Sequence, residues 1–507
     1  MKLPHTKILL LLLLVGVSPS CKESFLDVTP KDGSITDLSF WKTADDFIGV
    51  INSAYHDMEY NEASGEQWLA IPNLILQEVE QSGGPAELPA FFQPNRHGQW
   101  WATFYGMVHK TNLVLANAGN GKLKEDERAR VEAEAKFLRG FAYFNLTRAF
   151  GGVPLVLRPK TATDAKEDAR ATEAQSWDQV IEDLTAAEGL PVQWDADNTG
   201  RATRGAALAY LANAYMYKKD WPRALLAAEA LEAVANGGRY RLLDNYRDAF
   251  SEKKENGPES LFEVQYRPGY DNGWGKPSNI HYLGAYTSPG GAGDEFAVGG
   301  GWGTYVLSKS LGNSFEPGDR RRFAYQNPAG ETVYPAVLGP GESYRGEAFP
   351  TGMAYTLQPG TGSTGFYATK YWLGRVNDAD GGNYGGGQNL PQMRYAEAVL
   401  NYAEILSALG RTPEAYAQLN RVRRRAGLAD QPLADPAQCL RDINTERRHE
   451  LFFEPNLYFH FVRTGYITAF LRDTYGKTFQ EAWYRWPLPQ SEIDNNPALQ
   501  GFQNPGY

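Results

Sequence analysis

Few stretches of this sequence place catalytic residue types at a catalytic spacing. His449-Glu450 begins like the His-Glu-x-x-His pattern of a zinc helix, but Phe453 occupies the position of the second histidine. Residues 360–365 match the glycine spacing of a dinucleotide-binding loop, yet the flanking sequence predicts neither the strand nor the helix that such a loop joins. The Gly-x-Ser-x-Gly elbow and the complete Gly-x-x-x-x-Gly-Lys-Ser/Thr phosphate loop are both absent from the sequence. These patterns therefore give no support to a catalytic centre, a cofactor site or a metal site.

Acidic residues keep one enzymatic alternative open. Asp378 and Asp380 have the spacing of two calcium ligands, but the rest of a calcium-binding loop is missing, which favours a solvated acidic loop. A glycoside hydrolase needs only two facing carboxylates, so a surface glycoside hydrolase remains an alternative. The 60 acidic and 50 basic side chains give a net charge of −10, which disfavours binding to nucleic acid phosphates.

Aromatic residues in glycine-rich sequence are the clearest candidates for ligand contact. Residues 270–305 contain repeated glycines with tryptophan and tyrosine between them, and residues 349–389 continue in the same way. Glycine disfavours helices and permits unusual backbone angles, so we expect loops and short strands in both stretches. Long ordered loops inside a folded protein usually carry function.

The N-terminal sequence predicts export and a lipid anchor. Lys2 and Lys7 precede an apolar run over residues 8–17, which is too short to span a bilayer and is typical of a secretory signal peptide over residues 1–20. Cys21 follows the small residue Ser20, and this arrangement resembles a bacterial lipoprotein processing site. Lipidation of Cys21 would leave Cys439 as the remaining cysteine, so we expect no intramolecular disulfide. Acyl chains would then attach the protein to a membrane.

Apolar residues three and four positions apart predict helices in the rest of the chain. The expected helical ranges are 43–60, 100–118, 126–150, 173–189, 203–236 and 394–427. Two of them repeat one pattern, in which a helix ends at Lys219-Asp220-Trp221 or at Gly410 and a second helix follows. This pattern resembles the tetratricopeptide helix-turn-helix unit of about 34 residues. We therefore predict a mostly α fold, with a tetratricopeptide-like helical-repeat scaffold and an irregular, loop-rich region of short strands.

Further motifs are spread over nearly the whole mature sequence. They are Phe25-Leu26-Asp27, Phe40-Trp41-Lys42-Thr43, Glu134-Ala135-Lys136-Phe137-Leu138-Arg139, Gly151-Gly152-Val153-Pro154-Leu155, Gly200-Arg201-Ala202-Thr203, Ser260-Leu261-Phe262-Glu263-Val264, Arg394-Tyr395-Ala396-Glu397, Glu446-Arg447-Arg448-His449-Glu450-Leu451, Pro487-Leu488-Pro489 and Gln503-Asn504-Pro505-Gly506-Tyr507. Together they resemble the SusD/RagB family of outer-membrane nutrient-binding lipoproteins of Bacteroidetes. One motif departs from the family pattern, because Tyr458-Phe459-His460-Phe461 replaces the usual Trp-x-Asp-Leu before Arg463.

The resemblance implies a binding protein rather than an enzyme, and it also implies a location. We expect no cofactor. Family members are lipid-anchored at the outer membrane, face the cell exterior, and pass glycan or peptide fragments to a SusC-like TonB-dependent transporter. The resemblance also implies one SusD-like domain over residues 21–507. This domain would have helical repeats at about 43–236 and 394–455 and a ligand region at about 257–392. The helical repeats would contact the transporter. A tetratricopeptide-type protein-interaction scaffold in the periplasm remains an alternative.

The sequence and the resemblance together suggest roles for individual residues. Aromatic rings can cover the apolar face of a sugar, and the irregular segment from Tyr60 to Trp100 contributes to the binding face in this family. The candidate ligand-binding residues are Trp68, Trp274, Tyr282, Tyr286, Trp302 and Tyr305. The charged motif residues have a structural interpretation instead. We expect Glu134 with Arg139, and the charges between Glu446 and Glu450, to form buried ion pairs that hold helices in register.

Overall fold

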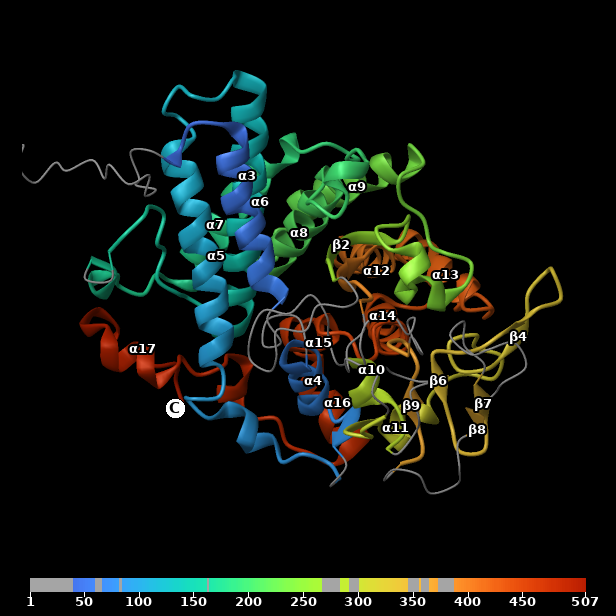
Figure 1. Cartoon of the computed structure of the whole chain (residues 1–507). Helices are drawn as coiled ribbons and strands as arrows, with labels where there is room; N and C mark the ends of the chain where they lie inside the picture. The colour runs from blue at the N-terminus through green and yellow to red at the C-terminus, as the bar shows by residue number, and fades with distance from the viewer. Residues whose placement is uncertain are drawn as a thin grey trace, which may run out of the picture.

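The computed structural model describes residues 40–59, 66–81, 84–161, 164–266, 283–290, 301–344, 355–356, 364–372 and 387–507. Helices dominate these ranges, and Figure 1 shows long helices gathered on one side and short strands on the other. The predicted signal peptide, Cys21, Trp274 and Tyr282 lie outside the described residues. None of the described helices is both long and apolar enough to cross a membrane.

The helices expected from periodicity are confirmed, and two of the predicted ranges are each divided into a pair. The helices are α3 (Ala44–His56), α5 (Gly98–Asn117), α6 (Glu125–Phe150), α7 (Glu173–Ala186), α8 (Arg204–Tyr217), α9 (Trp221–Asn236), α12 (Tyr395–Ala408) and α13 (Thr412–Arg425). Each helix packs against the next one along the chain in the pairs α5–α6, α6–α7, α8–α9 and α12–α13. This arrangement of neighbouring helix pairs is the predicted tetratricopeptide-like scaffold (Figure 1).

Local sequence explains where several of these helices begin. The Thr172 side chain accepts a hydrogen bond from the backbone N–H of Gln175 and forms a capping box with it at the start of α7. Thr203 caps α8 in the same way, and Asp220 caps α9. Because a cap satisfies backbone N–H groups that have no partner inside the helix, these polar residues set the helix boundaries.

Four further helices of eight or more residues lie among the described residues. They are α4 (Glu66–Ile75), α14 (Pro436–Glu450), α15 (Asn456–Arg463) and α16 (Tyr466–Tyr475). The short helices α11 (Lys309–Gly312) and α17 (Gln490–Asn495) accompany them. Helix α14 packs against α12 and α13, and α15 packs against α4 and α16. The segment from Tyr60 to Trp100, which we expected to be irregular, therefore contains helix α4. Pro72 lies inside α4. Because proline usually interrupts a helix, the helix propensity of this segment does not predict α4.

The strands of the described residues are short and pair in twos, as expected for the loop-rich region. The antiparallel pairs are β1 (Val79–Gln81) with β3 (Tyr305–Leu307), β2 (Ser260–Val264) with β10 (Leu390–Arg394), β4 (Tyr325–Gln326) with β5 (Thr332–Val333), β6 (Val337–Leu338) with β9 (Tyr367–Ala368), and β7 (Ser343–Tyr344) with β8 (Tyr355–Thr356). The β1–β3 pair joins the segment after α4 to the aromatic loop region. The β2–β10 pair leads directly into α12 and joins the loops to the helical scaffold.

Candidate functional site

The structure brings three of the predicted aromatic residues together. Tyr286 belongs to the short helix α10 (Leu283–Thr287), Tyr305 begins β3, and Trp302 lies just before β3. The ring centroids of Tyr286 and Trp302 are 4.9 Å apart with an interplanar angle of 85°, and those of Tyr286 and Tyr305 are 5.7 Å apart. Tyr286 and Tyr305 are 5% and 4% exposed, whereas Trp302 is only partly buried. Trp302 is therefore the member of this cluster that can offer ring surface to a ligand.

Glycines on both sides of Trp302 determine how its backbone lies. A Cβ on Gly301 would be 2.1 Å from the carbonyl oxygen of Pro289, and Gly303 has a φ of +63°. The backbone N–H of Gly303 donates to the carbonyl of Ser288 at 2.9 Å. Only glycine fits both positions, because the chain around Trp302 approaches residues 288–290 too closely for a side chain. The Gly-Trp-Gly sequence thus holds Trp302 against α10.

Trp68 lies in the core and not in this cluster. Its side chain is 1% exposed, and its ring stacks on Trp100 at 4.4 Å with an interplanar angle of 20°. Phe104 and the guanidinium of Arg148 also lie near the ring. Because these contacts cover Trp68, it offers no ring face to a ligand in this structure, and we leave it out of the site proposed below. Trp274 and Tyr282 lie outside the described residues.

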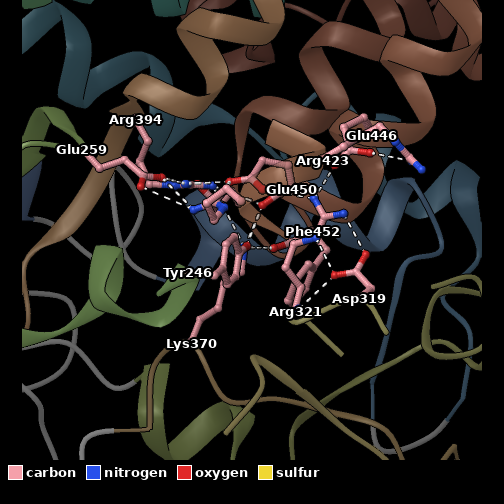
Figure 2. A network of polar contacts seen from close by, with 12 residues as sticks. Tyr246, Glu259, Asp319, Arg321, Lys370, Arg394, Arg423, Glu446, Glu450 and Phe452 are labelled. Carbon is pink, nitrogen blue, oxygen red and sulfur yellow. Dashed lines mark hydrogen bonds and ion pairs between the residues drawn. The ribbon is translucent and has the colours of Figure 1, made fainter. Parts of the chain in front are cut away.

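A buried network of charges joins the loop-rich region to the helical scaffold (Figure 2). The Arg394 guanidinium, which is 1% exposed, donates to Glu259 at 2.6 Å, to Glu450 at 2.9 Å and to Glu454 at 2.7 Å. Arg425 of α13 donates to Glu450 at 2.5 Å as well. Burial alone would raise the pKa of Glu450, but its three arginine neighbours hold that pKa well below the usual range.

Lys370 supplies the loop side of this network. It follows β9, and its ammonium group donates to the carbonyl of Phe452 at 2.6 Å and to Glu454 at 2.7 Å. The same group lies 3.9 Å from the centre of the Phe452 ring, which is favourable for a cation. Burial lowers the pKa of Lys370 to about 7, although Glu454 opposes this shift. The lysine therefore fixes the chain after β9 against the turn that follows α14.

Arg321 connects a second loop to α14. It is fully buried and donates to Asp319 at 2.7 Å, to Glu446 at 2.6 Å and to Glu450 at 3.1 Å (Figure 2). Sequence reasoning did not single out Arg321 or Lys370, because the acidic partners that they reach on α14 and in the turn after it lie more than eighty positions away along the chain. The run of three arginines from Arg320 to Arg322 beside Asp319 was the visible clue to buried charge.

The expected ion pairs exist, but one of them has different partners. Arg139 forms two 2.8 Å hydrogen bonds with Asp183 of α7, and Glu134 accepts from Arg201 at 2.8 Å and from Tyr55 at 2.9 Å. Our pairing of Glu134 with Arg139 was therefore wrong, although each residue does join helices through a buried contact. The charges of α14 also pair with other elements, through Arg447 with Glu404 and Arg448 with Glu78.

A cavity lies on the helical side, and its lining includes none of the residues of the aromatic cluster. Its volume is about 950 Å³, and it is bordered by α5, α6 and the segments around residues 157–159 and 189–194. Leu157 at its rim is 42% exposed, and Val192 beside it is 39% exposed. Within the described ranges, no three His, Cys, Asp or Glu side chains gather in a way that would hold a metal ion.

Comparison with known proteins identifies the family. A sequence model described as "SusD family" matches residues 258–507, and a second, described as "Starch-binding associating with outer membrane", matches residues 24–216. The chain belongs to the SusD/RagB family. Among its relatives in this family, "SusD-like protein P2" of Formosa agariphila is 28% identical over 99% of both chains.

Solved structures of the SusD family share the fold. A "Laminarin binding SusD-like protein" is 24% identical, covers 92% of this chain and 100% of its own, and gives a TM-score of 0.74. Surface glycan-binding protein A from Bacteroides thetaiotaomicron, solved in complex with laminarihexaose, is 23% identical, covers 91% of this chain and 99% of its own, and gives a TM-score of 0.71. At these identities the likeness establishes the fold and not the ligand.

Proposed function

We propose that this SusD/RagB protein is a cell-surface lipoprotein that binds glycan fragments and delivers them to a SusC-like TonB-dependent transporter. Membership of the family supports the proposal, and two proteins of the same fold are named as binding laminarin or as solved with laminarihexaose. Peptide fragments remain the alternative ligand. The protein acts by binding rather than by catalysis, so we expect the ligand to be released unchanged.

The aromatic cluster around Trp302 is the observation that supports ligand binding in this proposal. Trp302 is only partly buried, and buried Tyr286 meets its ring edge to face and fixes its orientation. A fixed aromatic ring can stack on the apolar face of a sugar and leave the sugar hydroxyls free for hydrogen bonds. Tyr286 and Tyr305 support the platform, and Trp274 and Tyr282 remain proposed contributors from the same stretch of sequence.

Calorimetry on a single variant tests this site. We expect Trp302→Ala to weaken binding of the cognate oligosaccharide by about 1–3 kcal/mol, the usual cost of losing a central aromatic contact. The probes are laminarihexaose, maltohexaose and a tryptic digest of casein, which separate two glycan classes from peptides. Phe323→Ala is the matched control, because Phe323 is an exposed aromatic residue of the loop-rich region outside the cluster. Unchanged affinity in Trp302→Ala, or an equal loss in Phe323→Ala, would remove the cluster from the site.

The anchor and the transporter need separate tests. Cys21→Ala should move the protein from the membrane fraction to the soluble fraction, because the acylated thiol is lost. Proteinase added to intact cells should digest the native protein if it faces the exterior, and complete protection would place it on the periplasmic side. Pull-down from outer membranes should recover a large barrel protein. We propose that the helical side, with its exposed Leu157 and Val192 beside the 950 Å³ cavity, makes that contact.

A further inference from the structure

Two adjoining cavities form a groove on the helical side, and we call them the α9 groove. One cavity has a volume of about 400 Å³ and the other about 650 Å³. Both are lined by Tyr217, Lys219, Arg463 and Thr464, so they meet at the end of α8. Trp221, the first residue of α9, lines the smaller cavity. Volumes in this range are typical of sites for small ligands.

The α9 groove holds polar groups that no other described residue satisfies. The Lys219 ammonium, the Tyr217 hydroxyl and the Trp221 indole N–H make no hydrogen bond or ion pair within the part of the chain that the structure describes. Lys219 is exposed, while Tyr217 and Trp221 are partly buried. Tyr217 stacks on Trp177 at 4.4 Å, so its ring is fixed and its hydroxyl is held at the wall of the groove. Tyr217 and Trp221 have lost part of their water without gaining a polar partner among the described residues, and the exposed Lys219 ammonium is free to pair with a ligand.

Lys219 has an unfavourable backbone conformation in the groove. Its φ is +55°, a left-handed conformation in which a residue with a Cβ is disfavoured. The Asp220 N–H donates to the carbonyl of Tyr215, which makes Lys219 the left-handed residue of a Schellman turn that ends α8. The equivalent turn at the end of α12 has Gly410 at this position with a φ of +75°, and Arg411 donates to Leu406 there. The two halves of the repeat thus differ by an unfavourable lysine where glycine is preferred.

The charges around the groove favour an anion. Arg463 and Glu404 line the smaller cavity, and Arg463 donates to Glu404 at 2.6 Å. Glu404 also accepts from the fully buried Arg447, which lies behind the groove wall, at 2.5 Å, so one carboxylate balances two guanidinium groups. Lys219 adds a further positive charge that pairs with no carboxylate of the described residues. In the larger cavity, Arg485 is balanced by Glu173, which lies 2.5 Å away. Glu481 remains as a carboxylate at that far end. The part that both cavities share is lined by Lys219 and Arg463 and by no carboxylate, so the positive charge of the groove gathers there.

We propose that the α9 groove is a second saccharide site, specific for a sugar unit that carries a carboxylate or a sulfate ester. Trp221 would stack on the sugar ring, since no other aromatic ring contacts it within the described residues. Lys219 would pair with the anionic group, and the Tyr217 hydroxyl would bind a sugar hydroxyl. The site lies among α8, α9, α12 and α14, on elements that do not include the Trp302 cluster. It is therefore independent of the ligand site proposed above.

Gly410 in the equivalent turn after α12 suggests glycine as the substitution that tests Lys219. Lys219→Gly removes the ammonium group and also relieves the left-handed strain, so the variant should melt at or above the temperature of the parent protein. With the full chain, calorimetry uses D-glucuronate, D-glucose 6-sulfate and D-glucose as probes. We expect the anionic sugars to bind more tightly than glucose, and Lys219→Gly to weaken their binding about ten-fold, as the loss of a charge-assisted hydrogen bond would.

Two further variants separate the roles. Trp221→Ala should weaken all three sugars, whereas Trp302→Ala should leave the binding of both anions unchanged. Binding of only the uronate, or only the sulfate ester, identifies the anionic group and supports the proposal. The proposal is overturned if glucose binds as tightly as both anions, or if Lys219→Gly binds both anions like the parent protein. Loss of anion binding in Trp302→Ala would assign it to the loop site instead.

Discussion

Glu404 is the carboxylate whose removal should be most informative for stability. It lies on α12, its side chain is 4% exposed, and its two oxygens accept from Arg463 at 2.6 and 2.8 Å and from Arg447 at 2.5 Å. Substitution Glu404→Gln keeps the shape of the side chain and leaves two buried guanidinium groups without a counter-charge. Removing one partner of a buried ion pair usually costs about 3–5 kcal/mol, because the remaining charge stays buried.

The pKa of Glu404 gives a second route to the same magnitude. Burial would raise this pKa, but Arg463 and Arg447 lower it from 4.5 to about 2. At about 1.4 kcal/mol per pH unit, the difference corresponds to about 3 kcal/mol of folding free energy at pH 7. Because the folded-state pKa is depressed, this stabilisation is complete above pH 4.5 and is lost as the pH falls toward 2. A protein of this size has an unfolding entropy of about 1 kcal/mol/K, so the melting temperature should fall by about 3 °C.

Urea unfolding followed by tryptophan fluorescence at pH 7 and at pH 3 measures this effect. We expect Glu404→Gln to unfold at lower urea than the parent protein at pH 7, and the gap to narrow at pH 3. Glu414→Gln is the matched control, because Glu414 lies in the first turn of the partner helix α13 and pairs with Arg411 at the surface. It should unfold like the parent protein. Equal unfolding of Glu404→Gln and the parent at pH 7, or a gap independent of pH, would refute the reasoning.

Two further predictions follow from buried groups. Burial raises the pKa of Glu397 to about 7, so this carboxyl stabilises the fold at low pH and less as the pH rises through 7. Urea unfolding of Glu397→Gln should therefore improve relative to the parent between pH 5 and pH 8, and a relative loss over that range would contradict this sign. A Cβ on Gly205 would lie 2.3 Å from the buried Tyr240 ring, so Gly205→Ala should destabilise by about 1–3 kcal/mol in the same assay. Gly49→Ala in α3, where nothing lies within 4 Å, should be neutral or stabilising, and equal behaviour of the two variants would dismiss the clash.

Periodicity predicted the scaffold because each helix buries a regular stripe of apolar residues. It predicted both α8 with α9 and α12 with α13, and capping residues such as Thr203 fix the ends. It failed for α4, where Pro72 argues against a helix and tertiary packing against α15 overrides that preference. The local sequence predicts helices well, because the hydrogen bonds of a helix join residues only four positions apart.

Partner choice among buried charges was not accessible from the sequence. Arg139 pairs with Asp183 of the next helix and not with Glu134, although Glu134 lies nearer along the chain. Glu134 and Arg139 both lie on α6, but they face different neighbouring elements. Only the packing of α3, α7 and the chain around Arg201 decides which carboxylate meets which cation. A motif of charged residues therefore predicts that buried ion pairs form, but it does not predict which residues are the partners.

The aromatic candidates show why residue type alone does not define a binding site. Trp68 and Trp302 are both tryptophans, but Trp100 and the guanidinium of Arg148 cover Trp68, whereas Trp302 meets Tyr286 edge to face and keeps exposed surface. Glycines 301 and 303 set the backbone of Trp302 against α10, while the backbone of Trp68 belongs to a helix packed on α15. The local backbone and the packing around it, and not the abundance of aromatic residues, therefore decide which tryptophan is buried and which is only partly buried.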